Sequence, residues 1–296
     1  MRTMPWAALA ALCLAACEPA LLPSPGFDAQ AATDALVAAV DGDALGLGDA
    51  ATATATLAGT WVLLTDWSTC VLIGDSLELR NYTLSKLEIV QDGFLLRETR
   101  EDCSLVNTPL LGITTVIPQP ALQSGNPMHA VAYVRDVGPG MPYLGGVEVQ
   151  SWGLQLDDPL GDPLPLSGDD PHVVDSDHDG HPGVSLELPG CNMYVAQRAV
   201  MVRTGKQEAS GAISGEGSRT LTQFHISDSG GVCGTQFNSI SNQTTNRWRM
   251  LRVDSAGLHL DGNGDGKVSC AEIVENQTQF AAWLEPNDAR CAASKP

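Results

Sequence analysis

Residues 261–272, DGNGDGKVSCAE, place oxygen-bearing residues at regular intervals around a glycine. Side-chain oxygens come at positions 1, 3 and 5, glycine permits a sharp turn at position 6, and position 7 offers its main-chain carbonyl. The serine at position 9 can bind through water, and the glutamate at position 12 can supply both carboxylate oxygens. Such ligands suit a hard divalent cation, so the stretch predicts a calcium site formed by Asp261, Asn263, Asp265, Lys267, Ser269 and Glu272.

Every ligand position of this stretch agrees with the calcium loop of the EF-hand family. A full hand has a helix on each side of the loop, whereas the residues before Asp261 are few and include Gly257. After the loop, a helix is expected from Ala271 to Glu285, ended by a proline. One loop with one helix is similar to the calcium segments of dockerin modules, which carry two such repeats, but only one is found here. The resemblance implies a structural calcium ion in a unit spanning 256–296.

A second acidic loop lies in VDSDHDGHPGVSLEL, residues 174–188. Asp175, Asp177 and Asp179 alternate ahead of a glycine, which repeats the first half of the pattern, and His181 offers a carbonyl at position 7. Position 12 is a leucine, however, and the next acid comes one residue late. The run is similar to calcium loops found singly in extracellular bacterial proteins and in thrombospondin-like repeats, which implies a second calcium site.

Two other interpretations of this second loop stay open. Its carboxylates can form a solvated acidic turn that holds no ion. The three histidines His172, His178 and His181 invite zinc binding, but they lie in a Pro/Gly-rich loop without the spacing of a helix or a strand. The oxygen ligands therefore favour calcium over zinc.

The N-terminus, MRTMPWAALAALCLAAC, has the pattern of an export signal. One arginine precedes an apolar run that is too short to span a bilayer as a mature helix. Residues 14–17, Leu-Ala-Ala-Cys, resemble the lipobox of bacterial lipoproteins at every position. The resemblance implies cleavage after residue 16, acylation of Cys17 and, with Glu18 next, an outer-membrane or surface location. Several acyl chains would make a firm anchor, and the alternative is an ordinary signal followed by a chance cysteine.

Export would place the remaining cysteines in an oxidising compartment. Six are left after Cys13 and Cys17, an even number that predicts three disulfides among 15 possible connectivities. No pair has the CxxC spacing of thiolate zinc sites or dithiol redox sites. Sequential pairing is expected because each bond would then close a local loop, which gives Cys70–Cys103, Cys191–Cys233 and Cys270–Cys291.

The 296-residue chain has a formal charge of -19, and 43% of its residues are hydrophobic. The negative charge argues against nucleic acid as a partner, because an acidic surface repels phosphates. The hydrophobic content suffices for a core, and 30 glycines with 18 prolines indicate many turns. Composition therefore favours a β-rich protein of one large domain or two ordinary ones.

The elements that would position these loops are strands. Strand-like segments separated by Gly, Pro, Asn and Asp begin at Gly59, and Asp92-Gly93 between two of them predicts a tight hairpin. About eight to ten strands without helical periods imply a mainly β fold, an antiparallel barrel or sandwich over 59–255. The chain would begin with a signal at 1–16 and a flexible tether at 17–58, in which residues 28–40 can form a short helix.

The first strand opens with Gly59-Thr60-Trp61, which is similar to the start of the lipocalin and other calycin barrels. In those barrels an arginine of the last strand packs across the tryptophan, a role open here to Arg247, Arg249 or Arg252. The resemblance implies a carrier for a small apolar ligand. A tryptophan buried in the core of any β-sandwich explains the same residues, so both interpretations stay open.

No group of residues predicts an enzyme. Ser227–Gly231 resembles the nucleophile segment of trypsin-like proteases, but its first glycine is missing, and His129 is a poor stand-in for the general base. The sequence therefore predicts a calcium-binding, lipid-anchored protein of the bacterial cell envelope, a binding or structural module in which calcium is structural. Its partners would be the membrane, through the lipid anchor, and a small apolar ligand or an envelope protein. A carrier of a small apolar ligand is the alternative, and an envelope hydrolase has the least support.

Overall fold

A computed structural model describes residues 56–73, 75–234, 238–241, 246–253 and 258–280. The predicted signal peptide, nearly all of the tether, Cys17 and Cys291 lie outside the described residues. Most of the described chain is β-strand, and its helices are short. None of these described helices is long and apolar enough to cross a membrane.

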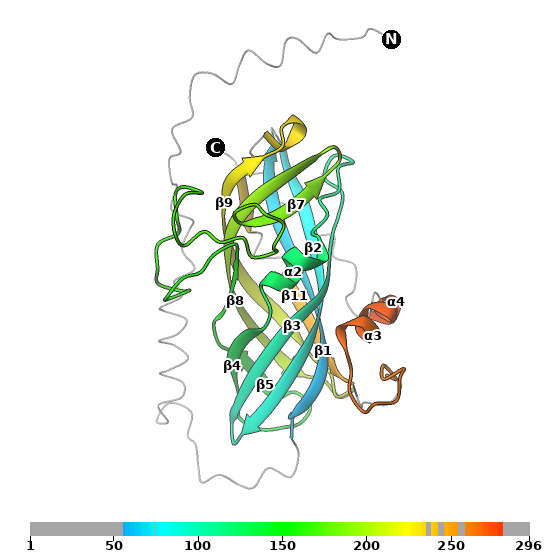
Figure 1. The fold of residues 1–296 in the computed structure, drawn as a ribbon. Coiled ribbons are helices and arrows are strands. Elements are labelled where there is room, and N and C mark those ends of the chain that lie inside the picture. Colours follow the sequence, from blue (N-terminus) through cyan, green and yellow to red (C-terminus); the bar gives the residue numbers. More distant parts are fainter. Residues whose placement is uncertain (1–55, 74, 235–237, 242–245, 254–257, 281–296) are drawn as a thin grey trace.

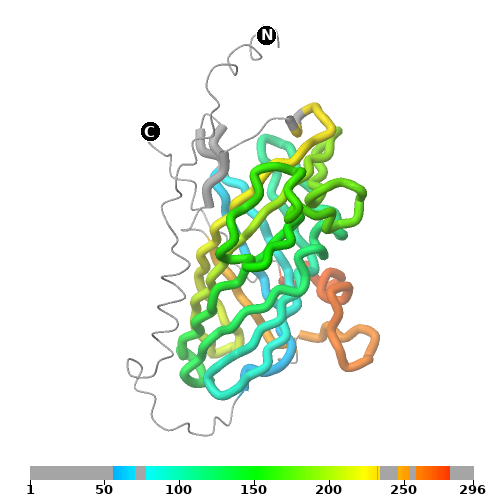
Figure 2. The backbone as a smooth tube through the Cα atoms, turned by 60° about the vertical axis from the view of Figure 1, so that its left-hand side comes forward, coloured from blue at the N-terminus to red at the C-terminus, as the bar shows by residue number. Residues whose placement is uncertain are grey.

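Eight strands form a closed antiparallel barrel, which Figure 1 and Figure 2 show from two sides. They pair in the order in which they occur in the chain, and the last of them pairs with the first. The predicted mainly β, antiparallel fold is thereby confirmed as a barrel and not a sandwich. The eight strands are β1 (Gly59–Ile73), β2 (Asp75–Asp92), β3 (Leu95–Asn107), β4 (Met128–Val134), β5 (Pro142–Gly145), β8 (Cys191–Gln207), β9 (Ile213–Asp228) and β11 (Arg247–Arg252).

Three shorter strands extend the barrel. β6 (Glu148–Trp152) and β7 (Val184–Leu188) pair with β8 beyond β5, and β10 (Asn238–Ser241) pairs with β1. Strand β8 is therefore paired along one side by β5, β6 and β7 in turn, and along the other side by β9. The long connection between β6 and β7, residues 153–183, carries the second acidic loop.

The turn between β2 and β3 is the hairpin that Asp92-Gly93 predicts. The two strands pair from Asp92 opposite Leu95, which leaves Gly93 and Phe94 as the turn. Gly93 has a φ of 59°, a conformation that residues with a Cβ rarely adopt. The glycine therefore suits the tight turn at which β2 ends and β3 begins.

The interior of the barrel is apolar near the start of β1. Alternate residues of this strand face inward, so Trp61 and Leu63 join Trp248 and Met250 in a buried cluster. The Trp61 indole donates a hydrogen bond to the carbonyl of Leu57 at 2.9 Å. This cluster is the main apolar core of the barrel.

Arginine and carboxylate side chains fill another part of the interior. Arg203 contacts Glu98 at 2.9 Å and Glu148 at 3.3 Å, and Arg100 pairs with Glu148 and with Asp102. All five side chains are almost fully buried. Burial raises the pKa of Glu98, and the charge of Arg203 opposes that shift.

Two short helices follow the predicted calcium loop, and Figure 1 shows them on the outside of the barrel. They are α3 (Cys270–Glu275) and α4 (Gln277–Phe280). The predicted helix from Ala271 to Glu285 is therefore two helices as far as Phe280, and the rest of its range lies outside the described residues. The third described helix, α2 (Gln119–Ser124), lies between β3 and β4.

The C-terminal helices cover an apolar patch on the outer wall of the barrel. Val62 and Leu64 face outward from β1, yet both are buried. Ile273 and Phe280 pack in the same cluster, together with Leu260 before the calcium loop. Burial of these side chains attaches the C-terminal unit to the barrel.

Two disulfides are described, and one of them corrects the predicted pairing. Cys191–Cys233 forms as predicted and joins the start of β8 to η2 (Gly231–Gly234). Cys103 is bonded to Cys270, 167 residues away, so the predicted bonds Cys70–Cys103 and Cys270–Cys291 are wrong. Cys70 is also disulfide-bonded. Because the C-terminal unit packs on β3, proximity in the fold selects the partner of Cys103, and proximity in sequence does not.

Candidate metal centres

The middle loop, residues 175–183, lies at the base of the connection between β6 and β7. The N–H of Val174 bonds to the carbonyl of Gly153 at 3.1 Å, and that of Gly183 bonds back to Val174 at 2.9 Å. The two ends approach closely, since a Cβ on Gly153 would lie 2.6 Å from the Cα of Gly183. These contacts hold the loop beside β7.

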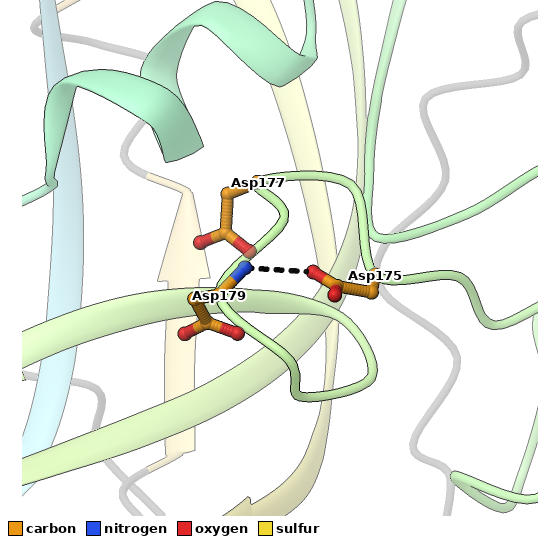
Figure 3. Close-up of side chains that lie close together, drawn as sticks. All are labelled: Asp175, Asp177 and Asp179. Atoms are coloured by element: carbon orange, nitrogen blue, oxygen red, sulfur yellow. Dashed lines mark hydrogen bonds between the residues drawn. The ribbon is translucent and has the colours of Figure 1, made fainter.

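Three carboxylates gather in the middle loop, as Figure 3 shows. One oxygen each of Asp175, Asp177 and Asp179 lies within 4.8 Å of the others. In the part of the chain that the structure describes, this is the one group of three Asp, Glu, His or Cys side chains so close together. Like charges at this distance repel each other, so a cation would stabilise the arrangement.

Asp177 is the buried member of the group, with 7% of its surface exposed. Its Oδ2 accepts hydrogen bonds from the main-chain N and the hydroxyl of Ser185, at 2.8 and 2.7 Å. Its Oδ1 is buried and has no hydrogen-bond partner among the described residues. A buried oxygen without a partner is unfavourable by roughly 1–3 kcal/mol, and a metal ion would supply the missing partner.

The first half of the middle loop is a hydrogen-bonded turn around Asp175. Its Oδ1 accepts from the N–H of Asp179 at 3.2 Å, and its Oδ2 accepts from that of Gly180 at 3.0 Å. The Oδ1 of Asp179 accepts in turn from the N–H of His181 at 2.9 Å. His178 and Gly180, at positions 4 and 6, have φ values of 60° and 90°.

The C-terminal loop, residues 261–272, repeats this turn position by position. The Oδ1 of Asp261 accepts from the N–H of Asp265 at 3.1 Å, and its Oδ2 accepts from that of Gly266 at 2.9 Å. The Oδ1 of Asp265 accepts from the N–H of Lys267 at 2.8 Å. The φ values at positions 4 and 6 are 72° and 78°, so the two loops share these hydrogen bonds and a positive φ at both positions.

The second half of the C-terminal loop leads into a helix. Ser269 is the N-cap of α3, and its hydroxyl accepts from the N–H of Glu272 while the Glu272 carboxylate accepts from the N–H of Ser269. The same carboxylate accepts from the N–H groups of Gly262 and Asn263, at 3.0 and 3.3 Å. These bonds lower the pKa of Glu272, and the bond from the Ser269 N–H contributes most.

The carboxylates of the C-terminal loop therefore serve its own main chain. Among the described residues, Asp261, Asp265 and Glu272 do not form a group as close as the one in the middle loop. Asn263 likewise turns its Oδ1 to the N–H of Asp265, at 2.9 Å. The predicted ligands of the C-terminal loop thus lie in one loop without forming such a group. Among the described residues, the middle loop is the one that brings three carboxylate oxygens together.

Two of the three histidines in or beside the middle loop have other partners. The ring of His181 stacks on Tyr194, with 4.2 Å between centroids. Nδ1 of His172 lies 2.8 Å from the Asp170 carboxylate, and the main-chain bond from His172 lowers the pKa of Asp170. No described histidine joins the three aspartates, so the group offers oxygen ligands and favours calcium over zinc.

Ser185 hydrogen-bonds to Asp177 of the candidate site, and sequence reasoning missed it. It lies in β7, after the acidic run, and no ligand pattern includes its position. The sequence signal that could have found Ser185 is the strand pattern of β7. That pattern places Ser185 beside Asp177 only if β7 is known to follow the loop directly.

The segment resembling a protease nucleophile forms a turn. The hydroxyl of Ser229 accepts a hydrogen bond from the N–H of Asn192 at 2.9 Å, and the Asp228 carboxylate accepts from the N–H of Gly230 at 2.7 Å. The bond from Asn192 ties this turn to the start of β8, beside the Cys191–Cys233 disulfide.

Arg252 is one of the three arginines that the sequence offers as a partner for Trp61. It lies opposite Trp61 in the pairing of β11 with β1, and a Cβ on Gly59 would lie 3.2 Å from its Nε. Arg249 instead pairs with Glu208 at 2.7 Å. Comparison of the chain with protein-family models, with curated proteins and with solved structures gives no match in any of the three.

Proposed function

We propose that this chain is a calcium-binding, lipid-anchored protein of the bacterial cell envelope, in which calcium has a structural role. The observation that carries the calcium proposal is the buried Oδ1 of Asp177, which lacks a partner inside a group of three carboxylates. The turn shared by the middle and C-terminal loops supports the same cation at both. Sites of this kind in extracellular modules bind calcium with Kd values on the order of 10⁻⁴–10⁻³ M, at which ambient calcium keeps them filled.

Calorimetry with calcium on the chelator-treated full chain tests this proposal. Two sites are expected, and calcium should raise the Tm, because an ion that binds only the folded state stabilises it by mass action. Asp261→Ala with Glu272→Ala should remove one site, and Asp175→Ala with Asp179→Ala the other. Absence of calcium uptake by the unsubstituted chain would refute the proposal.

The envelope location rests on the lipobox at residues 14–17. Expression in a bacterium with a labelled fatty acid should give a labelled, membrane-bound protein of mature size. Cys17→Ala should abolish the label and release the protein from the membrane fraction, while Cys13→Ala serves as the matched control. A labelled Cys17→Ala protein would contradict acylation at that residue.

A carrier of a small apolar ligand is the second candidate, favoured by the position of Arg252 against Gly59 and opposite Trp61. Against it stand the buried ion pairs of Arg100 and Arg203 in the interior. A groove of about 410 Å³ on the outer face of β2 and β3 is lined by polar residues such as Lys86 and Glu101. Titration with an apolar fluorophore should give no saturable binding if the calcium-stabilised module is the better description.

A further inference from the structure

We propose that an ion in the middle loop fastens the connection between β6 and β7 to the barrel wall, with Asp177 coupling ion occupancy to the position of β7. This inference rests on the proposed function, since it assigns a task to one of its two calcium sites. The task is local: the ion would close residues 153–183 without being required for the barrel itself.

The two carboxylate oxygens of Asp177 differ in their contacts. Oδ2 accepts hydrogen bonds from the main chain and the hydroxyl of Ser185 in β7, while Oδ1 is buried without a hydrogen-bond partner among the described residues. The same carboxylate belongs to the group that Asp175 and Asp179 complete. An ion on Oδ1 therefore holds the loop and β7 in one arrangement. Without an ion, repulsion within the group acts directly on the residue that anchors β7.

The base of the connection has little space in which to adjust. A Cβ on Gly183 would lie 2.5 Å from the carbonyl oxygen of Val195 and 2.6 Å from Ile226, and one on Gly168 would also lie 2.6 Å from Ile226. The connection thus packs closely on β8 and β9 at this point. A shift of Asp177 cannot be absorbed locally, and the base of the connection has to move away from the wall.

The outer part of the connection has a separate attachment. Arg198 in β8 donates through Nη1 to the carbonyls of Pro159, Leu160 and Asp162, at 3.2, 3.3 and 2.6 Å. This attachment uses no carboxylate of the middle loop. The ion is therefore expected to control the main-chain bonds near residues 172–185 more strongly than those near 158–162.

Hydrogen exchange of the full chain, followed by mass spectrometry with and without calcium, tests the proposal. Calcium at a few millimolar should slow exchange of peptides covering 172–185 by about tenfold. This factor follows because the calcium concentration would then exceed Kd by about tenfold. Asp177→Asn should abolish this protection. Asp265→Asn, a matched change in the C-terminal loop, should leave this protection intact. Exchange of the β8 peptides should be the same in every variant.

Calorimetry on the same samples separates this inference from the proposed function. If calcium binds and Asp177→Asn removes one site, but exchange at 172–185 does not respond to calcium, the fastening role is wrong and the calcium site stands. If no calcium binds, the proposed function fails and the inference with it. Equal loss of protection in Asp265→Asn would also overturn the assignment to the middle loop.

Discussion

The middle loop and the C-terminal loop begin with the same turn and end in different ways. In both, an aspartate at position 1 accepts the N–H groups of positions 5 and 6. The middle loop then runs into strand β7, where the N–H of Ser185 donates to the Asp177 carboxylate. The C-terminal loop runs into helix α3, where the N–H of the N-cap Ser269 donates to the Glu272 carboxylate. The turn is thus a local property of its sequence, and the element that follows decides where the remaining ligands point.

The two loops also differ in how they are attached to the barrel. Hydrogen bonds and close glycine contacts hold the middle loop. The C-terminal loop is attached by the Cys103–Cys270 disulfide and by apolar side chains on the outer wall. Substitutions that act on one kind of attachment should therefore separate the loops.

The largest difference is expected on removal of the Cys103–Cys270 bond. Replacing both cysteines by serine should lower the free energy of unfolding by about 3–5 kcal/mol, because the bond closes a long loop in the unfolded chain. Calcium uptake should weaken at the C-terminal loop only. Denaturant unfolding and calorimetry measure the two effects, with Cys191→Ser plus Cys233→Ser as the matched pair. Equal weakening at both loops would contradict the separation.

A cavity beneath α3 should have the next largest effect. Ile273 is fully buried against the barrel, so Ile273→Ala is expected to destabilise the C-terminal unit by about 2–4 kcal/mol. Leu166→Ala is the control, since Leu166 is 83% exposed in the connection that carries the middle loop, and it should change stability by about 0.5 kcal/mol or less. Thermal unfolding measures both variants, and similar losses would refute the role given to Ile273.

Two serines allow a direct comparison of the loop ends. Ser269→Ala removes the N-cap of α3, and Ser185→Ala removes the hydroxyl that binds Asp177; each should lower stability by about 1 kcal/mol. Hydrogen exchange should show the loss around α3 in the first variant and around β7 in the second. If either variant loosens both regions, the two loops are not independent.

Acid should have the smallest effect, a slight destabilisation of the C-terminal unit. The pKa of Glu272 is lowered in the folded chain, so its contribution is present above the ordinary value of 4.5 and is lost as pH falls through the folded pKa. The protection of peptides covering α3, measured against the intrinsic exchange rate at each pH, should therefore fall below about pH 4.5. Glu272→Gln should flatten this dependence, and an unchanged pH profile in that variant would contradict it.

Much of the fold follows from local patterns. Alternating strands and Asp92-Gly93 predict the hairpins, and the spacing from Asp261 to Glu272 predicts a turn and a following helix. Long-range choices do not follow. Nothing near Cys103 indicates that Cys270 will reach it, because that contact depends on the outward-facing Val62 and Leu64 needing cover.

The candidate sites divide in the same way. The sequence predicts Asp175, Asp177 and Asp179 as ligands, because the pattern that marks them is contained in the loop. Their unequal burial depends on β7, and the partner of Asp177 could not be read from the loop alone. The interior pairs of Arg100 with Glu148 and of Arg203 with Glu98 have no sequence signal, since each joins residues from separate strands.

The pairing of β1 with β11 sets the order in which the barrel can close. The edge of β1 that pairs with β11 stays open until the residues around Arg252 have followed, and the outward Val62 and Leu64 stay uncovered until Ile273 and Phe280 arrive. An open strand edge next to apolar side chains promotes pairing between chains. A chain truncated before residue 246 should accordingly accumulate as aggregates, because it lacks β11, α3 and α4, which cover the first strand.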